Sequence, residues 1–171
     1  NMIVQQKSML TISGVSAAGK EVVVKVGWNS KDFRVTSGTD GKFEVQVPTP
    51  KAGGPYTITI DDGEPLFLQN VLVGEVWLCS GQSNMEMPVA GWGKVMNYEK
   101  EIAEAIYPSI RLLQVKKVIS HVPSEKLEIN GDGWKECSPS SVENFSAVAY
   151  FYARNLWEKL KVPVGVIDRT W

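Results

Sequence analysis

The chain has 171 residues, a net charge of −1 and 43% hydrophobic residues. That length fits one ordinary domain, or a small domain plus part of another, and the composition is typical of globular rather than disordered proteins. Acidic and basic residues balance on both sides of Glu75, so no segment has the basic excess usual in nucleic-acid binders and membrane-surface proteins. The longest apolar run, 147–153, is far shorter than the roughly 20 residues that cross a bilayer. We expect a soluble globular protein without a nucleic-acid or membrane partner.

The first seventy residues carry the signals of short antiparallel strands. Four segments are rich in β-branched residues, mostly alternate, show no helical period and are separated by turn residues: 9–12, 22–26, 43–47 and 56–60. The Asp40-Gly41 pair, between Val35-Thr36 and Phe43, is typical of a hairpin turn. The pattern predicts a β-sandwich domain over residues 1–70.

Residues 71–171 predict the first part of an α/β domain with a parallel sheet. The predicted elements are a strand covered on both faces at 71–78, a helix at 95–106, a strand at 110–115, a helix at 145–160 and a strand from 164. Ser140, with Glu143 three residues later, is a candidate capping box for the longer helix. Trp77 and Trp157 lie within apolar patterns and are predicted core residues.

The turn that follows the first parallel strand is the candidate functional site. It reads Ser80-Gly81-Gln82-Ser83-Asn84 and stands where open α/β sheets bind ligands, beyond the carboxyl end of a strand. A serine after a turn glycine can present its hydroxyl above the sheet and its own N–H to an anion, which suits an acyl-transfer nucleophile. The alternative is a serine that serves turn chemistry alone. Met85 replaces the final glycine of the G-x-S-x-G elbow, which disfavours the α/β-hydrolase fold.

Residues 74–86, GEVWLCSGQSNME, resemble the nucleophile block of the sialate O-acetylesterase family in the SGNH hydrolase superfamily. The resemblance covers nearly the whole chain. It continues through the following segments: Val4-Gln5-Gln6, Asp40-Gly41-Lys42-Phe43, Gly53-Gly54-Pro55-Tyr56, Asn70-Val71-Leu72-Val73, Trp134, Cys137-Ser138-Pro139, 144–150 and Val162-Pro163-Val164-Gly165. It implies a β-sandwich followed by an SGNH-type α/β/α domain, over residues 1–70 and 71–171. The activity that it implies is removal of O-acetyl groups from a sugar, typically from the 9-position of sialic acid.

In the resembling family Ser83 corresponds to the nucleophile, and its backbone N–H to one oxyanion donor, with Gly81 in the same turn. The other donors are a glycine N–H and an asparagine, and the base is the histidine of a late Asp-x-x-His motif. Asp168-Arg169 departs from the small polar pair usual before the tryptophan at 171. We expect substrate contacts from four residues near the nucleophile: Gln82, Asn84, Glu86 and Trp92. Trp92 alternatively packs within its loop, and Glu86 alternatively caps the segment that follows.

His121 is the only histidine. Val118 stands where the motif needs aspartate, and the polar stretch 120–125 predicts a loop, so we interpret His121 as a surface residue. Cys79 and Cys137 have no metal-like partners, so no zinc site is expected. A disulfide between them is one alternative; a buried core position for Cys79 is the other. No phosphate-binding or dinucleotide motif occurs, so no cofactor is implied.

Both ends of the sequence indicate part of a longer protein. Met2 stands behind an Asn, no signal peptide is visible, and the chain stops four residues after a predicted strand. We therefore expect an incomplete and inactive esterase whose whole form is periplasmic or extracellular. The alternatives are an acetylxylan or other glycan esterase, and a β domain that binds carbohydrate or serves only as a scaffold.

Overall fold

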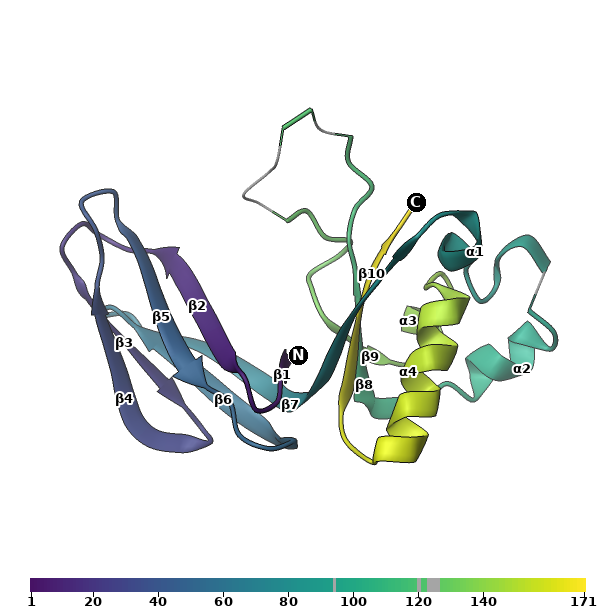
Figure 1. The fold of residues 1–171 in the computed structure, drawn as a ribbon, viewed down its shortest axis with the longest axis horizontal. Helices are drawn as coiled ribbons and strands as arrows, with labels where there is room; N and C mark the ends of the chain where they lie inside the picture. Colours follow the sequence, from purple (N-terminus) through teal and green to yellow (C-terminus); the bar gives the residue numbers. More distant parts are fainter. Residues whose placement is uncertain (94, 120, 123–126) are drawn as a thin grey trace. The chain divides into compact units, whose positions relative to one another are not determined.

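The computed structural model describes residues 1–93, 95–119, 121–122 and 127–171. The fold is mixed α/β and mostly β. The chain forms two compact units, Val4–Gly74 and Glu75–Trp171, the second of which also includes Asn1–Ile3 (Figure 1). Within the described part of the chain, none of the helices combines the length and the apolar character that a membrane crossing requires.

The unit Val4–Gly74 is antiparallel throughout its two sheets. Its strands are β2 (Met9–Val15), β3 (Glu21–Val26), β4 (Asn29–Thr36), β5 (Lys42–Pro48), β6 (Gly53–Asp61) and the first part of β7 (Leu66–Gly81). One sheet has the order β4-β3-β6-β7, the other pairs β2 with β5, and β1 (Met2–Gln5) pairs with β7. Alternating side chains are buried, as the period of two predicts, with Val22, Val24 and Ile58 almost completely so.

The hairpin predicted at Asp40-Gly41 is wrong. The turn itself forms: Gly41 has φ +77°, and the Asp40 carboxylate accepts a hydrogen bond from the Lys42 N–H. However, β4 pairs with β3 and β5 pairs with β2, so the turn joins strands of different sheets. Turn chemistry sets the local bend, whereas the partner of each strand depends on packing between residues far apart in sequence.

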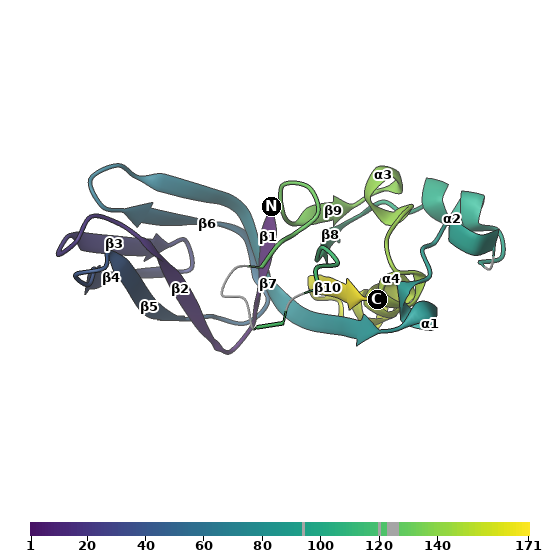
Figure 2. The same cartoon turned by 90° about the horizontal axis from the view of Figure 1, so that it is seen from above.

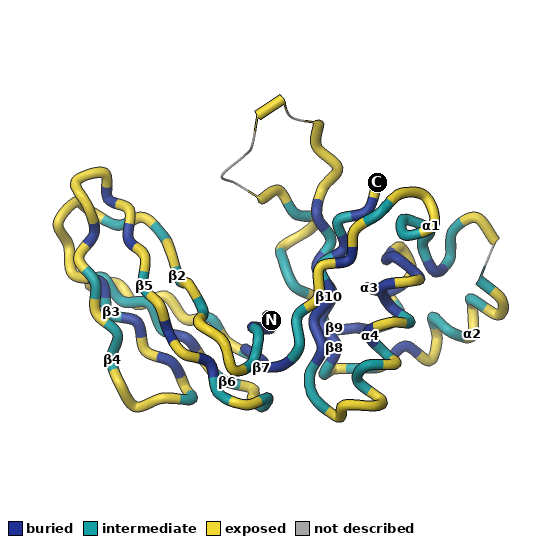
Figure 3. The backbone as a smooth tube through the Cα atoms, viewed as in Figure 1, coloured by how far each residue is buried: buried dark blue, intermediate teal, exposed yellow. Residues whose placement is uncertain are grey.

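In the unit Glu75–Trp171, the strands stand in the order β7-β10-β8-β9. Strands β8 (Tyr107–Gln114) and β10 (Val164–Thr170) run parallel to the end of β7, and β9 (Lys135–Cys137) is antiparallel to β8. The helices lie together on one face of this sheet (Figures 1 and 2); they are α1 (Ser83–Glu86), α2 (Tyr98–Ala103), α3 (Pro139–Val142) and α4 (Ala147–Leu160). The core lies between α4 and the strands, where buried stretches of both face one another (Figure 3).

Three local predictions for this unit need correction. Helix α2 begins at Tyr98 rather than residue 95, because Asn97 has a left-handed backbone with φ +55°. The cap of α4 is Ser146, whose hydroxyl accepts the Ala149 N–H, so Ser140 and Glu143 form no capping box for it. Strand β7 is not covered on both faces: Trp77 is 43% exposed and packs edge-on against a half-exposed tyrosine of α4, and the next residue is more exposed still.

Candidate active site

The carboxyl ends of three parallel strands meet at one edge of the sheet. In the β7–β10 pair Thr170 stands beside Gly81, and in the β10–β8 pair Asp168 stands beside Gln114. Polar side chains therefore lie together near the point where β7 ends and α1 begins. This is the edge at which open α/β sheets bind ligands.

Ser83 is the first residue of α1 and is exposed. The carbonyl of Gln82 accepts the first helical hydrogen bonds, from the N–H groups of Met85 and Glu86. The N–H groups that open a helix have no acceptor within it, so those of Ser83 and Asn84 face outward at this end. The turn thus presents a hydroxyl and outward N–H groups at the same place, the arrangement that the sequence predicts for a nucleophile.

Gly81 is needed for this turn. Its φ is +156°, and a Cβ there would lie 2.6 Å from the Cγ of Met85. A side chain at this position would therefore push against α1 itself. The absence of a side chain lets the helix begin two residues after the strand ends.

Helix α4 holds the other side of the turn. The Ser146 hydroxyl donates to the Met85 carbonyl at 2.5 Å, and the Ala147 N–H donates to the Met87 carbonyl at 2.8 Å. Ser146 is completely buried. The short helix that carries Ser83 is thus attached to the longest helix of the unit.

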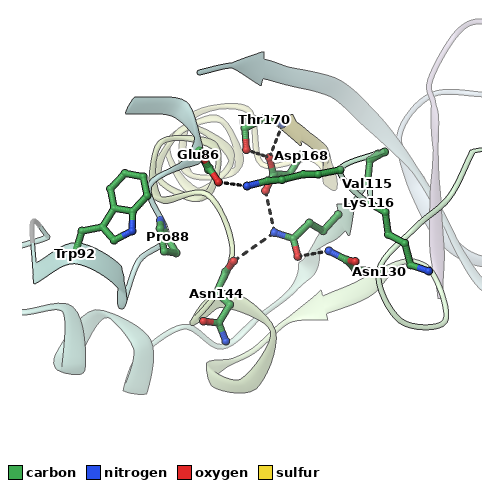
Figure 4. A pocket seen from close by; sticks show the side chains of 11 residues that line it. Glu86, Pro88, Trp92, Val115, Lys116, Asn130, Asn144, Asp168 and Thr170 are labelled. Carbon is green, nitrogen blue, oxygen red and sulfur yellow. Dashed lines mark hydrogen bonds and ion pairs between the residues drawn. The ribbon is translucent and has the colours of Figure 1, made fainter. Parts of the chain in front are cut away.

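A cavity of about 490 Å³ lies beside α1 (Figure 4). Its lining consists of Glu86, Pro88, Trp92, Gln114, Val115, Lys116, Lys117, Asn130, Asn144, Asp168 and Thr170. Of the predicted substrate contacts, Glu86 and Trp92 line this cavity, and Gln82 and Asn84 do not. Glu86 lies three residues after Ser83, one helical turn away, so the cavity adjoins the candidate nucleophile.

Trp92 stands at the cavity with an unusual backbone. Its φ is +59°, a left-handed conformation that bulky residues seldom adopt, and its side chain is 56% exposed. The indole therefore presents much of its surface to solvent rather than to the protein interior.

Asp168 and Gln114 form a polar floor that the sequence analysis did not assign. The Asp168 carboxylate accepts hydrogen bonds from Thr170, at 2.7 Å from its hydroxyl and 3.2 Å from its N–H, and from the Gln114 side-chain amide at 3.3 Å. Asn130 in turn donates to Gln114 at 2.9 Å. The available signal was positional, since both residues stand at the carboxyl ends of predicted strands.

The two lysines of the cavity lining each have a carboxylate partner. Lys117 forms an ion pair with Glu86, and Lys116 pairs with Glu128 at 3.8 Å. The Glu86 side chain thus faces the cavity as part of an ion pair, so its predicted alternative role as a helix cap is not needed to explain its position.

His121 is exposed; most of the predicted loop 120–125 lies outside the described residues. Among the residues that the structure describes, no group of three or more His, Cys, Asp or Glu side chains could hold a metal ion. Among the described residues, no histidine forms a hydrogen bond in the turn that carries Ser83.

Cys79 and Cys137 are both free and buried. They lie on β7 and β9, with β10 and β8 between them, so three strand spacings of about 4.8 Å separate them. A disulfide needs Cα atoms within about 7 Å, so the predicted alternative of a bond between them is wrong. Burial raises the pKa of the Cys137 thiol to about 12 and also raises that of Cys79, which leaves both thiols protonated.

The chain is similar to several sialate O-acetylesterases. The rat protein is 32% identical over 190 residues, which include all of this chain and 34% of the rat protein. The mouse and human proteins are each 29% identical over 172 residues, which cover 94% of this chain. The match covers 30% of the mouse protein and 31% of the human protein. The chain thus spans about a third of the length of these relatives.

Its structure is also similar to a crystal structure of a carbohydrate acetylesterase from Xanthomonas citri. The TM-score is 0.89 at 32% identity, over 99% of this chain and 38% of that one. No protein-family model matches the chain. Sequence and structure agree on the relatives, and both support a place in the sialate O-acetylesterase family for this chain, which spans about a third of those proteins.

Proposed function

We propose that the chain is the amino-terminal part of a carbohydrate esterase that removes O-acetyl groups with Ser83 as the nucleophile. The observation that carries the proposal is the position of Ser83, exposed at the start of α1 where the parallel strands end. The names of the relatives and of the similar structure support the same reaction class.

The proposed reaction is acyl transfer in two steps. The Ser83 Oγ attacks the acetyl carbonyl carbon and passes its proton to a general base, which gives that proton to the departing sugar oxygen. The base then takes a proton from a water molecule, which attacks the acetyl-serine, and returns that proton to the Ser83 Oγ as the acyl bond breaks and acetate leaves. The backbone N–H of Ser83 stabilises the negative carbonyl oxygen in both steps, while Gly81 permits the turn.

We assign the base to the histidine of the family's Asp-x-x-His motif rather than to His121. A serine hydroxyl without a base is a weak nucleophile, so residues 1–171 alone should turn over negligibly. Two domains follow from the same resemblance: a β-sandwich over 1–70, and the beginning of an SGNH-type α/β/α domain over 71–171.

The proposed substrate is 9-O-acetylated sialic acid, with acetylxylan or another acetylated glycan as the second candidate. Gln82 and Asn84 flank the nucleophile, and Glu86 and Trp92 face the neighbouring cavity, which supports all four as substrate contacts. These substrates also lead us to propose a periplasmic or extracellular location. For the unit Val4–Gly74 we favour a scaffold over a carbohydrate-binding role, because it contains a single tryptophan, Trp28.

Acetate release tests the proposal. A protein extended through the family's histidine motif should release acetate from 9-O-acetylated sialic acid, and Ser83→Ala should abolish this while His121→Ala leaves it unchanged. If the protein releases acetate only from an aryl acetate, and Ser83→Ala abolishes that release, the esterase assignment holds but sialic acid is not the substrate. A Ser83→Ala variant as active as the unaltered protein would refute the assignment of the nucleophile.

A further inference from the structure

We propose that the cavity beside α1 is a binding subsite for an uncharged, hydroxyl-rich part of a sugar, with Asp168 as its central hydrogen-bond acceptor. The inference rests on the proposed function and extends it from the reacting ester to the sugar that carries the ester. It assigns a role to Asp168 and Gln114, which lie outside the nucleophile turn.

Asp168 has acceptor capacity to spare. A carboxylate offers about four acceptor positions, and the described hydrogen bonds use three of them: two from Thr170 and one from Gln114. Its side chain is only 2% exposed, yet it lines the cavity (Figure 4). An acceptor at such depth favours a small neutral donor, and a sugar hydroxyl is one.

The neighbouring amides are already oriented. The Gln114 side chain receives a hydrogen bond from Asn130 and donates to the Asn144 carbonyl as well as to Asp168, so its amide direction is determined. Asn130 and Asn144 also line the cavity. Amides offer both donors and acceptors, which matches hydroxyl groups, and the hydrogen bonds that hold the Gln114 and Asn130 side chains lower the entropic cost of binding.

The charges of the cavity oppose an anionic ligand there. Among the described lining residues both lysines are paired with carboxylates, so a ligand carboxylate would compete with Glu86 at Lys117 and with Glu128 at Lys116. It would also approach the carboxylate of Asp168. The exposed indole of Trp92 at the same cavity can cover the apolar face of a sugar ring.

Nuclear magnetic resonance of the ¹⁵N-labelled chain tests the subsite with three probes that carry no acetyl ester: N-acetylneuraminic acid, its methyl ester and xylotetraose. The first two differ in one group, which is a charged carboxylate in the acid and a neutral methyl ester in its derivative. We expect a neutral probe to shift the signals of the Trp92 indole N–H, the Gln114 side-chain amide and the Thr170 N–H. Response to the methyl ester alone would assign the cavity to the side chain of sialic acid, and response to xylotetraose alone to a plain sugar ring.

Asp168→Asn should weaken binding about tenfold, the loss of a hydrogen bond to a charged acceptor. Asp40→Asn, the same change in the other unit, should leave binding unaltered. Trp92→Leu, at an exposed position, gives a second variant that should also weaken binding if Asp168→Asn disturbs the local fold.

The proposal is overturned if neither neutral probe shifts these signals at millimolar concentration, or if the free acid binds more tightly than its methyl ester. Unchanged binding in both variants would also overturn it. Because no probe carries an acetyl ester, binding is independent of Ser83. The subsite proposal can therefore be supported even if no Ser83-dependent acetate release is found. It can also be refuted even if that release is found.

Discussion

The hydroxyl of Ser146 donates a 2.5 Å hydrogen bond to the carbonyl of Met85, two residues beyond Ser83. The same hydroxyl accepts the Ala149 N–H and so caps α4. One buried side chain therefore both begins the longest helix of its unit and fixes the short helix that carries the candidate nucleophile.

Ser146→Ala should destabilise the chain by about 1–2 kcal/mol, because it removes a helix cap and leaves the partly buried Met85 carbonyl with one partner fewer. Urea unfolding measures the loss. Ser140→Ala is the matched control: Ser140 is exposed and its hydroxyl contacts that of Ser138, so we expect a change within about 0.5 kcal/mol. Equal stability of the two variants would contradict the anchoring role of Ser146.

Gly81→Ala should disturb the nucleophile turn. The new Cβ would meet the Met85 side chain, and the φ of +156° is unfavourable for a residue with a side chain, so we expect a loss of about 1–3 kcal/mol. In the extended protein, acetate release should fall with it, since α1 would be displaced.

A double variant separates steric clash from backbone strain at this position. In Gly81→Ala with Met85→Ala the nearer clashing atom, the Met85 Cγ at 2.6 Å, is gone and only the Cβ contact at 2.9 Å remains, so the loss should be smaller than the sum of the two single losses. Additive losses would mean that the clash with the Met85 Cγ contributes nothing to the loss.

The sequence predicts individual elements well where the signal is local. Helix α4 and the strands around residues 22–26 and 56–60 follow from periodicity, and Pro163 lies beyond the end of α4 as expected. Pairing is different: β10 lies between β7 and β8, although it follows both in the chain. No local pattern encodes that order, because it depends on contacts between residues far apart in sequence.

The candidate site likewise has a part that local sequence predicts and a part that depends on contacts distant in sequence. The turn at Ser83 is readable because its residues are consecutive and follow a strand. The floor of the cavity is not, because Gln114 and Asp168 are 54 residues apart and meet only once β8 and β10 pair. Trp92 is predictable as an aromatic residue near the nucleophile turn, whereas its left-handed backbone is visible only in the structure.

Both cysteines should be unreactive in the folded chain and reactive once it unfolds. A thiol with a pKa of about 12, as in Cys137, has almost no thiolate at pH 8, and both side chains are buried. A thiol reagent at pH 8 should therefore label neither residue in buffer and both in denaturant without reductant. Failure to label either residue in denaturant would indicate a disulfide and contradict the strand order.

Alkaline pH should destabilise the chain through Cys137 and Tyr150. Burial raises the pKa of both groups to about 12, from ordinary values of 9.0 for the thiol and 10.0 for the phenol. The folded chain therefore keeps protons that the unfolded chain releases. The stability that these groups contribute is complete below about pH 9 and is lost as the pH rises towards 12, by at most about 1.4 kcal/mol per pH unit for each group.

Urea unfolding at a series of pH values between 7 and 11 measures this slope. Tyr150→Phe keeps the buried ring but removes its proton, so the free energy of unfolding should fall less steeply above pH 10 than in the unaltered chain. Cys137→Ala should lessen the fall from about pH 9 upward. The comparison uses slopes because either variant also changes packing, which shifts the whole curve. A slope unaffected by both substitutions would mean that other groups release the protons.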